Sequence, residues 1–416
     1  MTDGTTATPR MTDAAADKLS TLLNKVPEVT VFFWVIKVLC TTVGETASDF
    51  LNVNLNFGLT GTSLVMGVLL VVTLAVQFRT KRYVPVIYWL NVVLISIFGT
   101  LVTDNLTDVL GFPLEYSTIL FSALLLVTFA VWYAQEKTLS IHSIFTARRE
   151  AFYWLAVLFT FALGTAAGDL MAEALGLGYA TTGIIIAIIV LLFAAAWRLR
   201  LNAILAFWVI YIMTRPLGAS LGDFLTQSQE HGGLGLGATT TTVVFTAGII
   251  GTVLYLALTR RDVTTEADLR EDAIVAQRHA HVFAQVAVVA ILFAVASIGG
   301  YFWRQDQLLA AQQTASTAGA NDPSAPLGDL TSFHGVTQAM LDAVNGGDWA
   351  TANSRANDIE YAWDNAEAQL KPMNGGAWTH LDGAIDKVLR EARAVSPNQQ
   401  SAQAALQALL AAIAKP

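Results

Sequence analysis

The chain has 416 residues, of which 54% are hydrophobic and only 13% charged, and its formal net charge is −8 at pH 7. This composition is typical of a polytopic membrane protein and excludes an ordinary soluble enzyme. The single cysteine, Cys40, excludes an intramolecular disulfide framework and a thiolate-only metal cage.

The N-terminal region is polar, rich in Thr and Ala, and has no pattern of basic, apolar and small residues that would mark a cleaved signal peptide. We therefore expect residues 1–28 to be a disordered cytoplasmic leader. Nine apolar runs follow, each of about 18 to 23 residues and long enough to span a bilayer as a helix. The runs lie at roughly 29–48, 62–79, 84–103, 117–136, 151–169, 180–198, 203–222, 239–259 and 281–303.

Basic residues lie on one side of these spans. Lys and Arg cluster after the even-numbered runs, whereas the segments 49–61, 104–116, 169–181 and 223–238 contain none. Since positive loops stay in the cytoplasm, the sequence predicts a cytoplasmic N-terminus and an extracytoplasmic tail.

One pattern occurs four times: Trp, nine residues, Gly, four residues, Asp. The copies are Trp34-Gly44-Asp49, Trp89-Gly99-Asp104, Trp154-Gly164-Asp169 and Trp208-Gly218-Asp223. Each copy begins a hairpin of two spans, so all four hairpins have the same orientation and can surround an axis as a ring or as paired dimers. The predicted domain is 29–262, with repeats at 29–83, 84–150, 151–202 and 203–262.

Positions 7, 11, 14 and 15 after each Trp share one helical face with it. This face is polar or small, as are many surfaces that face other helices or a water-filled path within a membrane. We therefore predict an axial polar pathway, and assign close helix packing to the repeated Gly. The predicted lining residues are Thr41, Ser48, Ser96, Thr100, Thr103 and Thr165.

Carboxylates gather at the outer ends of the first helices. The predicted ion-binding residues are Glu45, Asp49, Asp104, Asp108, Asp169, Glu173 and Asp223. A site that offers carboxylate oxygens and few Cys, Met or His side chains favours hard divalent cations such as Mn, Mg or Ca. Two alternatives remain open: the acids bind protons, or the four Asp residues simply mark helix ends.

Two basic residues lie within the spans. Arg215 is mid-helix, beside Pro216, and is expected to pair with Glu45 or Asp223. Lys37 is near the cytoplasmic end, where it either snorkels to the interface or serves as a second charge partner. Hydroxyl residues at the start of the second helices are predicted N-caps: Thr62, Ser117, Thr182 and Thr239–Thr242.

The four motifs are FWVIKVLCTTVGETASD, YWLNVVLISIFGTLVTD, YWLAVLFTFALGTAAGD and FWVIYIMTRPLGASLGD. They resemble a bacterial family of membrane-anchored proteins built from four tandem repeats of unknown function, and the resemblance covers residues 28–262. It implies a bacterial inner-membrane location and supplies no catalytic residue.

The ninth span with its flanks occupies 263–310, a flexible linker occupies 311–329, and four amphipathic helices are predicted in an extracytoplasmic bundle at 330–416. The tail is acidic. A second candidate metal site is formed by Asp358, Asp364, Glu367, Asp382 and Asp386, with His380 or His334. The alternative is a solvated acidic face around a core of Trp349, Trp363 and Trp378.

The fold class predicted is therefore all-α, a multi-pass membrane protein with an extracytoplasmic helical bundle. The first functional hypothesis is transport of a divalent cation, manganese-like and exported, by an axial carboxylate site. The second is a proton- or sodium-coupled carrier or channel, and the third is a membrane-anchored sensor or scaffold. The sensor predicts that Asp49, Asp104, Asp169 and Asp223 tolerate Asn, whereas transport predicts the reverse.

Several classes of activity are not expected. No nucleophile with a base, phosphate loop or catalytic His motif occurs, so no enzyme and no resident cofactor are predicted. The acidic tail excludes nucleic acid as its partner. The expected partners are the lipid bilayer and metal cations or protons, with a homo-oligomer left open.

Overall fold

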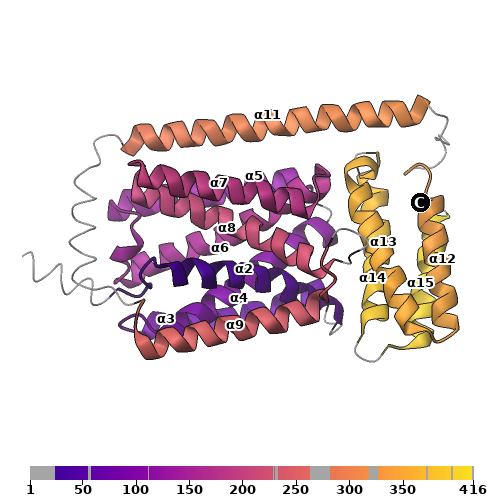
Figure 1. Ribbon diagram of the computed structural model, residues 1–416, viewed down its shortest axis with the longest axis horizontal. Helices are drawn as coiled ribbons and strands as arrows, with labels where there is room; N and C mark the ends of the chain where they lie inside the picture. Colours follow the sequence, from indigo (N-terminus) through magenta and orange to yellow (C-terminus); the bar gives the residue numbers. More distant parts are fainter. Residues whose placement is uncertain are drawn as a thin grey trace, which may run out of the picture.

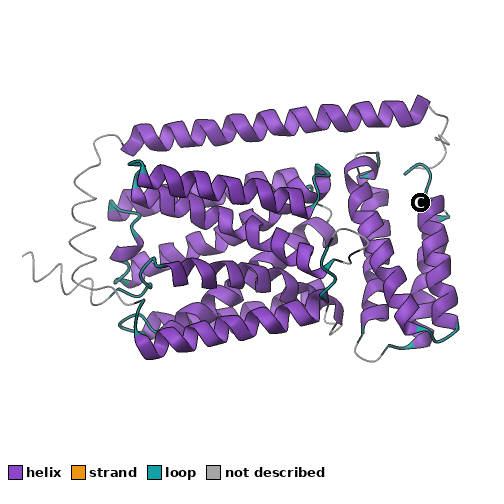
Figure 2. Cartoon of the chain, viewed as in Figure 1, coloured by secondary structure: helices purple, strands orange, loops and turns teal. Residues whose placement is uncertain are grey.

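Helices form almost all of the computed structural model, and no strand occurs in the part of the chain that it describes (Figure 2). The structure describes residues 24–54, 58–110, 112–227, 229, 233–262, 282–317, 327–371, 373–394 and 397–414. Two bodies are visible in Figure 1: a bundle built by the repeats, and a smaller bundle of C-terminal helices beside one end of it.

The first helices of the four repeats form an inner ring. They are α2 (Val31–Asp49), α4 (Pro85–Asp104), α6 (Ala147–Asp169) and α8 (Ala203–Thr226). α2 packs against α4, α4 against α6, α6 against α8, and α8 against α2. The predicted ring therefore closes within a single chain and needs no second copy.

The second helices form an outer layer and pack chiefly on the inner helix of the following repeat. They are α3 (Leu59–Arg79), α5 (Leu114–Glu136), α7 (Tyr179–Arg198) and α9 (Gly237–Thr259). α3 lies on α4, α5 on α6, and α7 on α8, while α9 returns to α2. Each repeat thus covers its neighbour, and the fourth repeat closes the ring by covering the first.

The repeated Gly brings neighbouring inner helices into close contact. Each Gly faces position 7 of the next repeat: Gly44 faces Ser96, Gly99 faces Phe161, Gly164 faces Arg215, and Gly218 faces Thr41. A Cβ added at Gly99 would lie 2.8 Å from the Phe161 Cβ, and one at Gly164 would lie 2.5 Å from the Arg215 Cβ. Real side chains do not approach so closely, so the prediction of a packing function for this Gly is confirmed.

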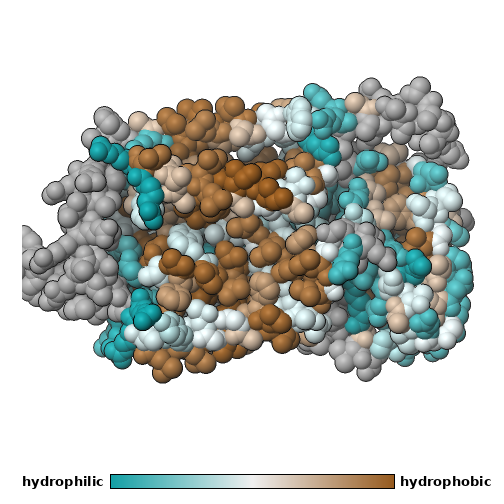
Figure 3. Space-filling model, viewed as in Figure 1, coloured by the Kyte–Doolittle hydropathy of each residue, from teal (hydrophilic) through white to brown (hydrophobic). Residues whose placement is uncertain are grey.

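Nine helices among the described residues are long and apolar enough to cross a membrane, by length and composition. The apolar cores of the inner helices are 56–67% buried, whereas those of the outer helices are 11–28% buried. The ninth, in α11 (Val282–Thr317), lies along the outside and is not buried (Figure 1). Figure 3 shows a largely apolar belt between two more polar ends, as expected for a surface that contacts lipid.

The C-terminal body consists of α12 (Thr331–Asn345), α13 (Trp349–Leu370), α14 (Gly375–Arg393) and α15 (Gln399–Ile413). The four predicted amphipathic helices are thereby confirmed as elements. Trp363 and Trp378 stack face to face in their core, with ring centroids 3.8 Å apart. Trp349 is only partly buried at the edge of this core.

Several predicted boundaries were wrong. The outer helices begin three residues or so before the predicted hydroxyl caps, so Thr62, Ser117, Thr182 and Thr241 are buried inside helices and do not cap them. α11 continues to Thr317, so the predicted linker begins later than 311. The predicted leader also includes described residues that pack on the bundle; residues 1–23 lie outside the described part.

Residues 24–30 cross the end of the ring that carries the repeated Trp, which we call the tryptophan end. Their backbone bonds to three connecting segments: Lys25 N–H donates to Ile144, Glu28 N–H donates to Asp262, and Asn24 accepts from Tyr83. The Lys25 ammonium lies 2.5 Å from a carboxylate oxygen of Glu150, with both side chains buried. Gln77 also donates to Glu150, at 2.9 Å. These bonds from residues 24–30 stabilise the connecting segments at the tryptophan end.

Substituting Lys25 with Met should therefore destabilise the bundle, because Glu150 would keep a buried charge with only Gln77 as a donor. The expected loss is roughly 1.5–3 kcal/mol, measured as a lower unfolding temperature of the purified protein. The matched control is Arg148→Met, since Arg148 forms an equally short pair with Glu136 but its side chain is 64% exposed. That variant should lose less than about 1 kcal/mol. Equal losses for the two variants would contradict the prediction.

Candidate functional site

The four repeated Asp residues lie at the opposite end of the ring, which we call the aspartate end. Three inner helices do not stop at their Asp but continue into π-helical turns: η1 (Phe50–Asn54), η2 (Asn105–Val109) and η4 (Leu170–Ala174). Such turns often occur at functional sites. Two of them carry the additional acids Asp108 and Glu173.

A cavity of about 660 Å³ lies between the aspartate end and the C-terminal bundle. We call it the acidic chamber. The repeat domain contributes seven carboxylates to its lining: Glu45, Asp49, Asp104, Asp108, Asp169, Glu173 and Asp223. The structure therefore brings together, around one cavity, all the carboxylates predicted to bind ions in this domain.

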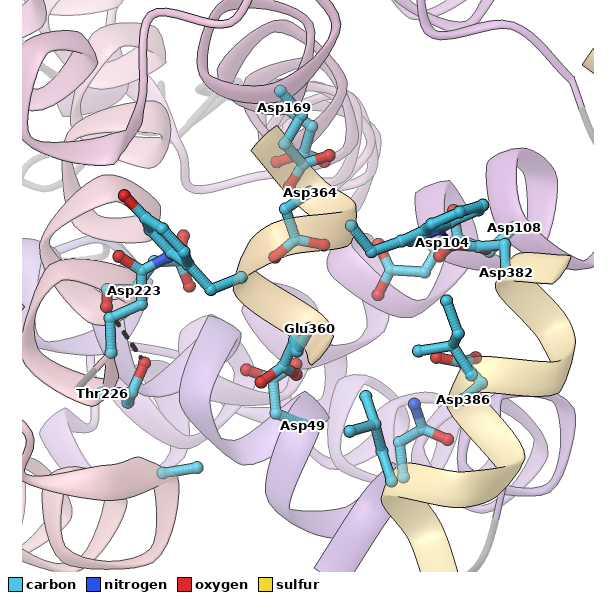
Figure 4. A pocket seen from close by; sticks show the side chains of 18 of the residues that line it. Asp49, Asp104, Asp108, Asp169, Asp223, Thr226, Glu360, Asp364, Asp382 and Asp386 are labelled. Atoms are coloured by element: carbon cyan, nitrogen blue, oxygen red, sulfur yellow. Dashed lines mark hydrogen bonds between the residues drawn. The ribbon is translucent and has the colours of Figure 1, made fainter. Parts of the chain in front are cut away.

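The C-terminal bundle forms the opposite wall of the chamber. α14 packs against η1 and η2, and α13 packs against η4. The five carboxylates of this wall are Glu360, Asp364, Glu367, Asp382 and Asp386. Figure 4 shows these tail helices reaching over the aspartate end, with Glu360 near Asp49 and Asp382 near Asp108.

Arg215 closes the inner end of the chamber on the ring axis. Its guanidinium is completely buried and lies 2.6 Å from a carboxylate oxygen of Glu45. It also donates to the hydroxyls of Thr100 and, at 2.8 Å, Thr165, and to the Thr41 carbonyl at 3.2 Å. One side chain of the fourth repeat thus bonds to all three other repeats. The predicted pairing with Glu45 is confirmed, and the alternative pairing with Asp223 is not present.

The residues predicted to line a pathway are buried in contacts between helices and do not line the chamber. Thr41, Thr100 and Thr165 surround Arg215, and Ser96 faces Gly44. Thr103 donates to the carbonyls of Gly99 and Ala162, and Ser48 is buried beside Asp49. Among the described residues, Arg215 and its bonding partners therefore fill the polar centre of the ring at this level.

The prediction that Lys37 snorkels or pairs with a carboxylate was wrong. Its side chain is 1% exposed, and its ammonium lies 3.5 Å from the centre of the Phe161 ring and 4.1 Å from that of Tyr211. No acceptor among the described residues bonds to it. Cation–π contacts replace the expected ion pair because aromatic side chains of α6 and α8 meet at this level.

Burial in the chamber raises the pKa values of several carboxyl groups of the C-terminal bundle. Burial raises the pKa of Asp382 to about 7, with the adjacent Asp386 as the next cause, and burial raises the pKa of Asp386 to about 6. Burial and the facing Glu173 also raise the pKa of Asp364. A carboxyl with a raised pKa prefers its protonated form. Docking of the tail should therefore weaken as the pH rises from roughly 4, the ordinary Asp value, to about 7.

The second metal site predicted within the tail does not form as expected. Asp364, Glu367, Asp382 and Asp386 line the chamber and face the repeat domain, whereas Asp358 pairs with Arg355 at 2.8 Å and does not line it. His334 and His380 are not among the lining residues. No three His, Cys, Asp or Glu side chains of the described residues converge on one metal position.

The chamber is also lined by polar residues that were not predicted from the sequence, among them Asn52, Glu360, Lys371 and Arg393. Helical spacing could have identified Glu360, because Glu360, Asp364 and Glu367 are at i, i+4 and i+7 on one face of α13. Asp358 is off that face. Nothing local indicates Asn52, which reaches the chamber through the π-helical turn η1.

One family model matches the chain four times. It is the Repeat of Unknown Function (DUF347), matched at residues 32–83, 87–138, 152–201 and 206–262. These matches cover just over half of the chain, and each spans most of one inner helix and all of the outer helix that follows it. No curated protein and no solved structure matches the chain.

Proposed function

Because the chain belongs to the family of the Repeat of Unknown Function (DUF347), whose four copies build the ring and its acidic end, we propose that it is a multi-pass membrane transporter of hard divalent cations. The proposal places it in the bacterial inner membrane, with the tryptophan end in the cytoplasm and the acidic chamber outside. The positive loops and the apolar belt support this orientation.

The acidic chamber is the observation that carries the proposal. Twelve carboxylates and two cationic side chains, Lys371 and Arg393, line it, which gives a formal charge of −10 when all are ionised. So many like charges in an enclosed space repel one another unless cations or protons neutralise them. Carboxylate, amide and hydroxyl oxygens are the ligands of hard cations.

In the proposed mechanism, Arg215 blocks the axis until a cation displaces it from Glu45. A cation that reaches Glu45 competes with the guanidinium for the same carboxylate, so its arrival releases Arg215 from the axis. Pro216 follows Arg215 inside α8 and has no N–H to bond the preceding turn. The helix can therefore bend where Arg215 must move. A divalent metal is favoured over sodium because each divalent ion neutralises twice as much of the chamber's negative charge.

The test is cation flux through proteoliposomes that contain the full chain, with manganese, magnesium and calcium as separate probes and both flux directions measured. Glu45→Gln and Asp104→Asn each remove a charged ligand from the chamber, which is worth roughly 1.5–3 kcal/mol. Flux of the transported ion at limiting concentration should therefore fall about 10- to 100-fold. Unfolding temperatures of both variants are measured in parallel.

The matched control is Asp358→Asn, which removes an acid of the C-terminal bundle outside the chamber. It should keep the wild-type flux. If the folded wild-type protein moves none of these ions in either direction, the transport of divalent cations is refuted. Proton or sodium flux, or tolerance of Asn at all four repeated Asp positions, would then select between the coupled carrier and the sensor.

A further inference from the structure

Like charges face each other across the acidic chamber. Glu360 of the C-terminal bundle faces Asp49 at the aspartate end. Asp382 and Asp386 face Asp108 in η2. Two cations of the bundle also interact with acids of the repeat domain, Arg393 with Asp49 and Lys371 with Glu173, but the twelve carboxylates of the chamber outnumber them. A surface that docks through charge would be expected to balance its charges, and this one does not.

Carboxylates also face each other at a third place, beside η4. Glu367 and Asp364 both face Glu173 in η4. Carboxylates of the two bodies therefore oppose each other in or directly beside all three π-helical turns, which are the main places where α13 and α14 contact the repeat domain.

The cations of the C-terminal wall have partners within the bundle. Lys371 binds Glu367 at 2.7 Å, and Arg393 binds Glu360 through both carboxylate oxygens, the longer contact being 2.9 Å. Arg390 is 3.8 Å from Asp386. Among the described residues, no Lys or Arg forms an ion pair with Asp104, Asp108, Asp169 or Asp223. The chain itself thus leaves most of the opposing charge at the aspartate end unneutralised.

A separate observation points to a missing ligand. Asn52 lies in η1, lines the chamber and is only 7% exposed, yet the oxygen of its side-chain amide has no hydrogen-bond partner in the described structure. A buried acceptor without a donor is costly unless water or a cation binds it. Oxygen acceptors of this kind complete the coordination of hard cations alongside carboxylates.

We propose that the C-terminal bundle is a lid held by cations: divalent cations bridge the carboxylates of the two walls and keep the bundle docked, and the bundle leaves the aspartate end when the chamber is empty. The inference rests on the proposed cation chamber and adds its regulation. No three His, Cys, Asp or Glu side chains of the described residues converge on one position, so the bridging ions keep part of their water shell, as Mg²⁺ usually does.

The test measures docking and not transport. Spin labels are placed at Tyr116→Cys in α5 and Ser354→Cys in α13, two exposed positions, in a Cys40→Ala background that removes the single native cysteine. Pulsed electron resonance then gives the distance distribution. Magnesium is the probe, because it is not paramagnetic, and choline chloride of equal ionic strength controls for screening.

At mildly alkaline pH, magnesium should give one narrow distance, whereas a chelator or choline should give a broad distribution with longer distances. The ratio of docked to undocked protein should change at least about tenfold.

Neutral variants distinguish a lid held by cations from an interface that is simply damaged by substitution. Asp364→Asn combined with Asp382→Asn should stay docked in the chelator, because the repulsion is lower, while Asp358→Asn should behave as wild type. A wild-type distance that ignores magnesium, or undocking of the neutral variant, overturns the lid. Docking that depends on magnesium in a protein without cation flux would keep the lid and reject transport.

Discussion

Replacing Arg215 with Met is expected to lose at least about 3–5 kcal/mol of stability. The guanidinium is completely buried and bonds to Glu45, Thr100, Thr165 and the Thr41 carbonyl. Met fills a similar volume but leaves the Glu45 charge and three polar groups without their donor. The measurement is the unfolding temperature in detergent, followed by tryptophan fluorescence, together with the recovery of monodisperse protein.

The double variant Arg215→Met with Glu45→Gln separates charge from packing. It removes the uncompensated carboxylate, so it should be more stable than Arg215→Met alone. Arg215→Lys should fall between Met and wild type, because an ammonium reaches Glu45 but lacks the planar fork that bonds several partners at once. If Arg215→Met unfolds at the wild-type temperature, Arg215 does not hold the ring together.

Gly218→Ala should cost about 3 kcal/mol, the upper part of the usual range for overpacking. The added Cβ would overlap Thr41, lying 2.5 Å from its Cβ, and would be 3.0 Å from the Thr42 backbone nitrogen. The Thr41 hydroxyl is fixed by its bond to the Val38 carbonyl, so α2 and α8 must separate. The unfolding temperature of the purified protein should fall, and the Arg215 contacts to α2 should weaken with it.

Gly251→Ala is the matched control, since it makes the same change in the outer helix α9. A Cβ at Gly251 meets nothing within 4 Å. Ala has the higher helix propensity, so this variant should be neutral or more stable by up to about 1 kcal/mol. Similar losses at Gly218 and Gly251 would show that helix propensity, and not the close approach of α2 and α8, determines the effect.

The sequence predicted most of the elements because their signals are local. A run of about 20 apolar residues requires a helix that satisfies its own backbone, whatever packs against it. The nine long helices and the four helices of the tail were therefore found, with errors of a few residues at their ends. The π-helical turns were missed because nothing in a segment such as Phe50–Asn54 distinguishes them from a loop.

Only part of the site was predicted, because some of its residues are brought together from distant parts of the chain. The Trp-Gly-Asp spacing placed Asp49, Asp104, Asp169 and Asp223 at one end of the ring, since identical repeats have identical geometry. The spacing did not reveal that the tail covers this end, because Glu360 and Asp49 are more than 300 residues apart. For the same reason Lys37 was assigned to an interface and not to the rings of Phe161 and Tyr211.

The sequence by itself thus determined the helices, the fourfold repeat, the Gly that allows close packing and the carboxylates at one end. Periodicity and hydrophobicity depend on neighbouring residues, so they can be read without a fold. Only the tertiary structure decided that each outer helix covers the next repeat, that Arg215 pairs with Glu45 and not with Asp223, and that carboxylates of the tail face carboxylates of the repeats. These features depend on contacts between distant segments, whose energies no local pattern contains.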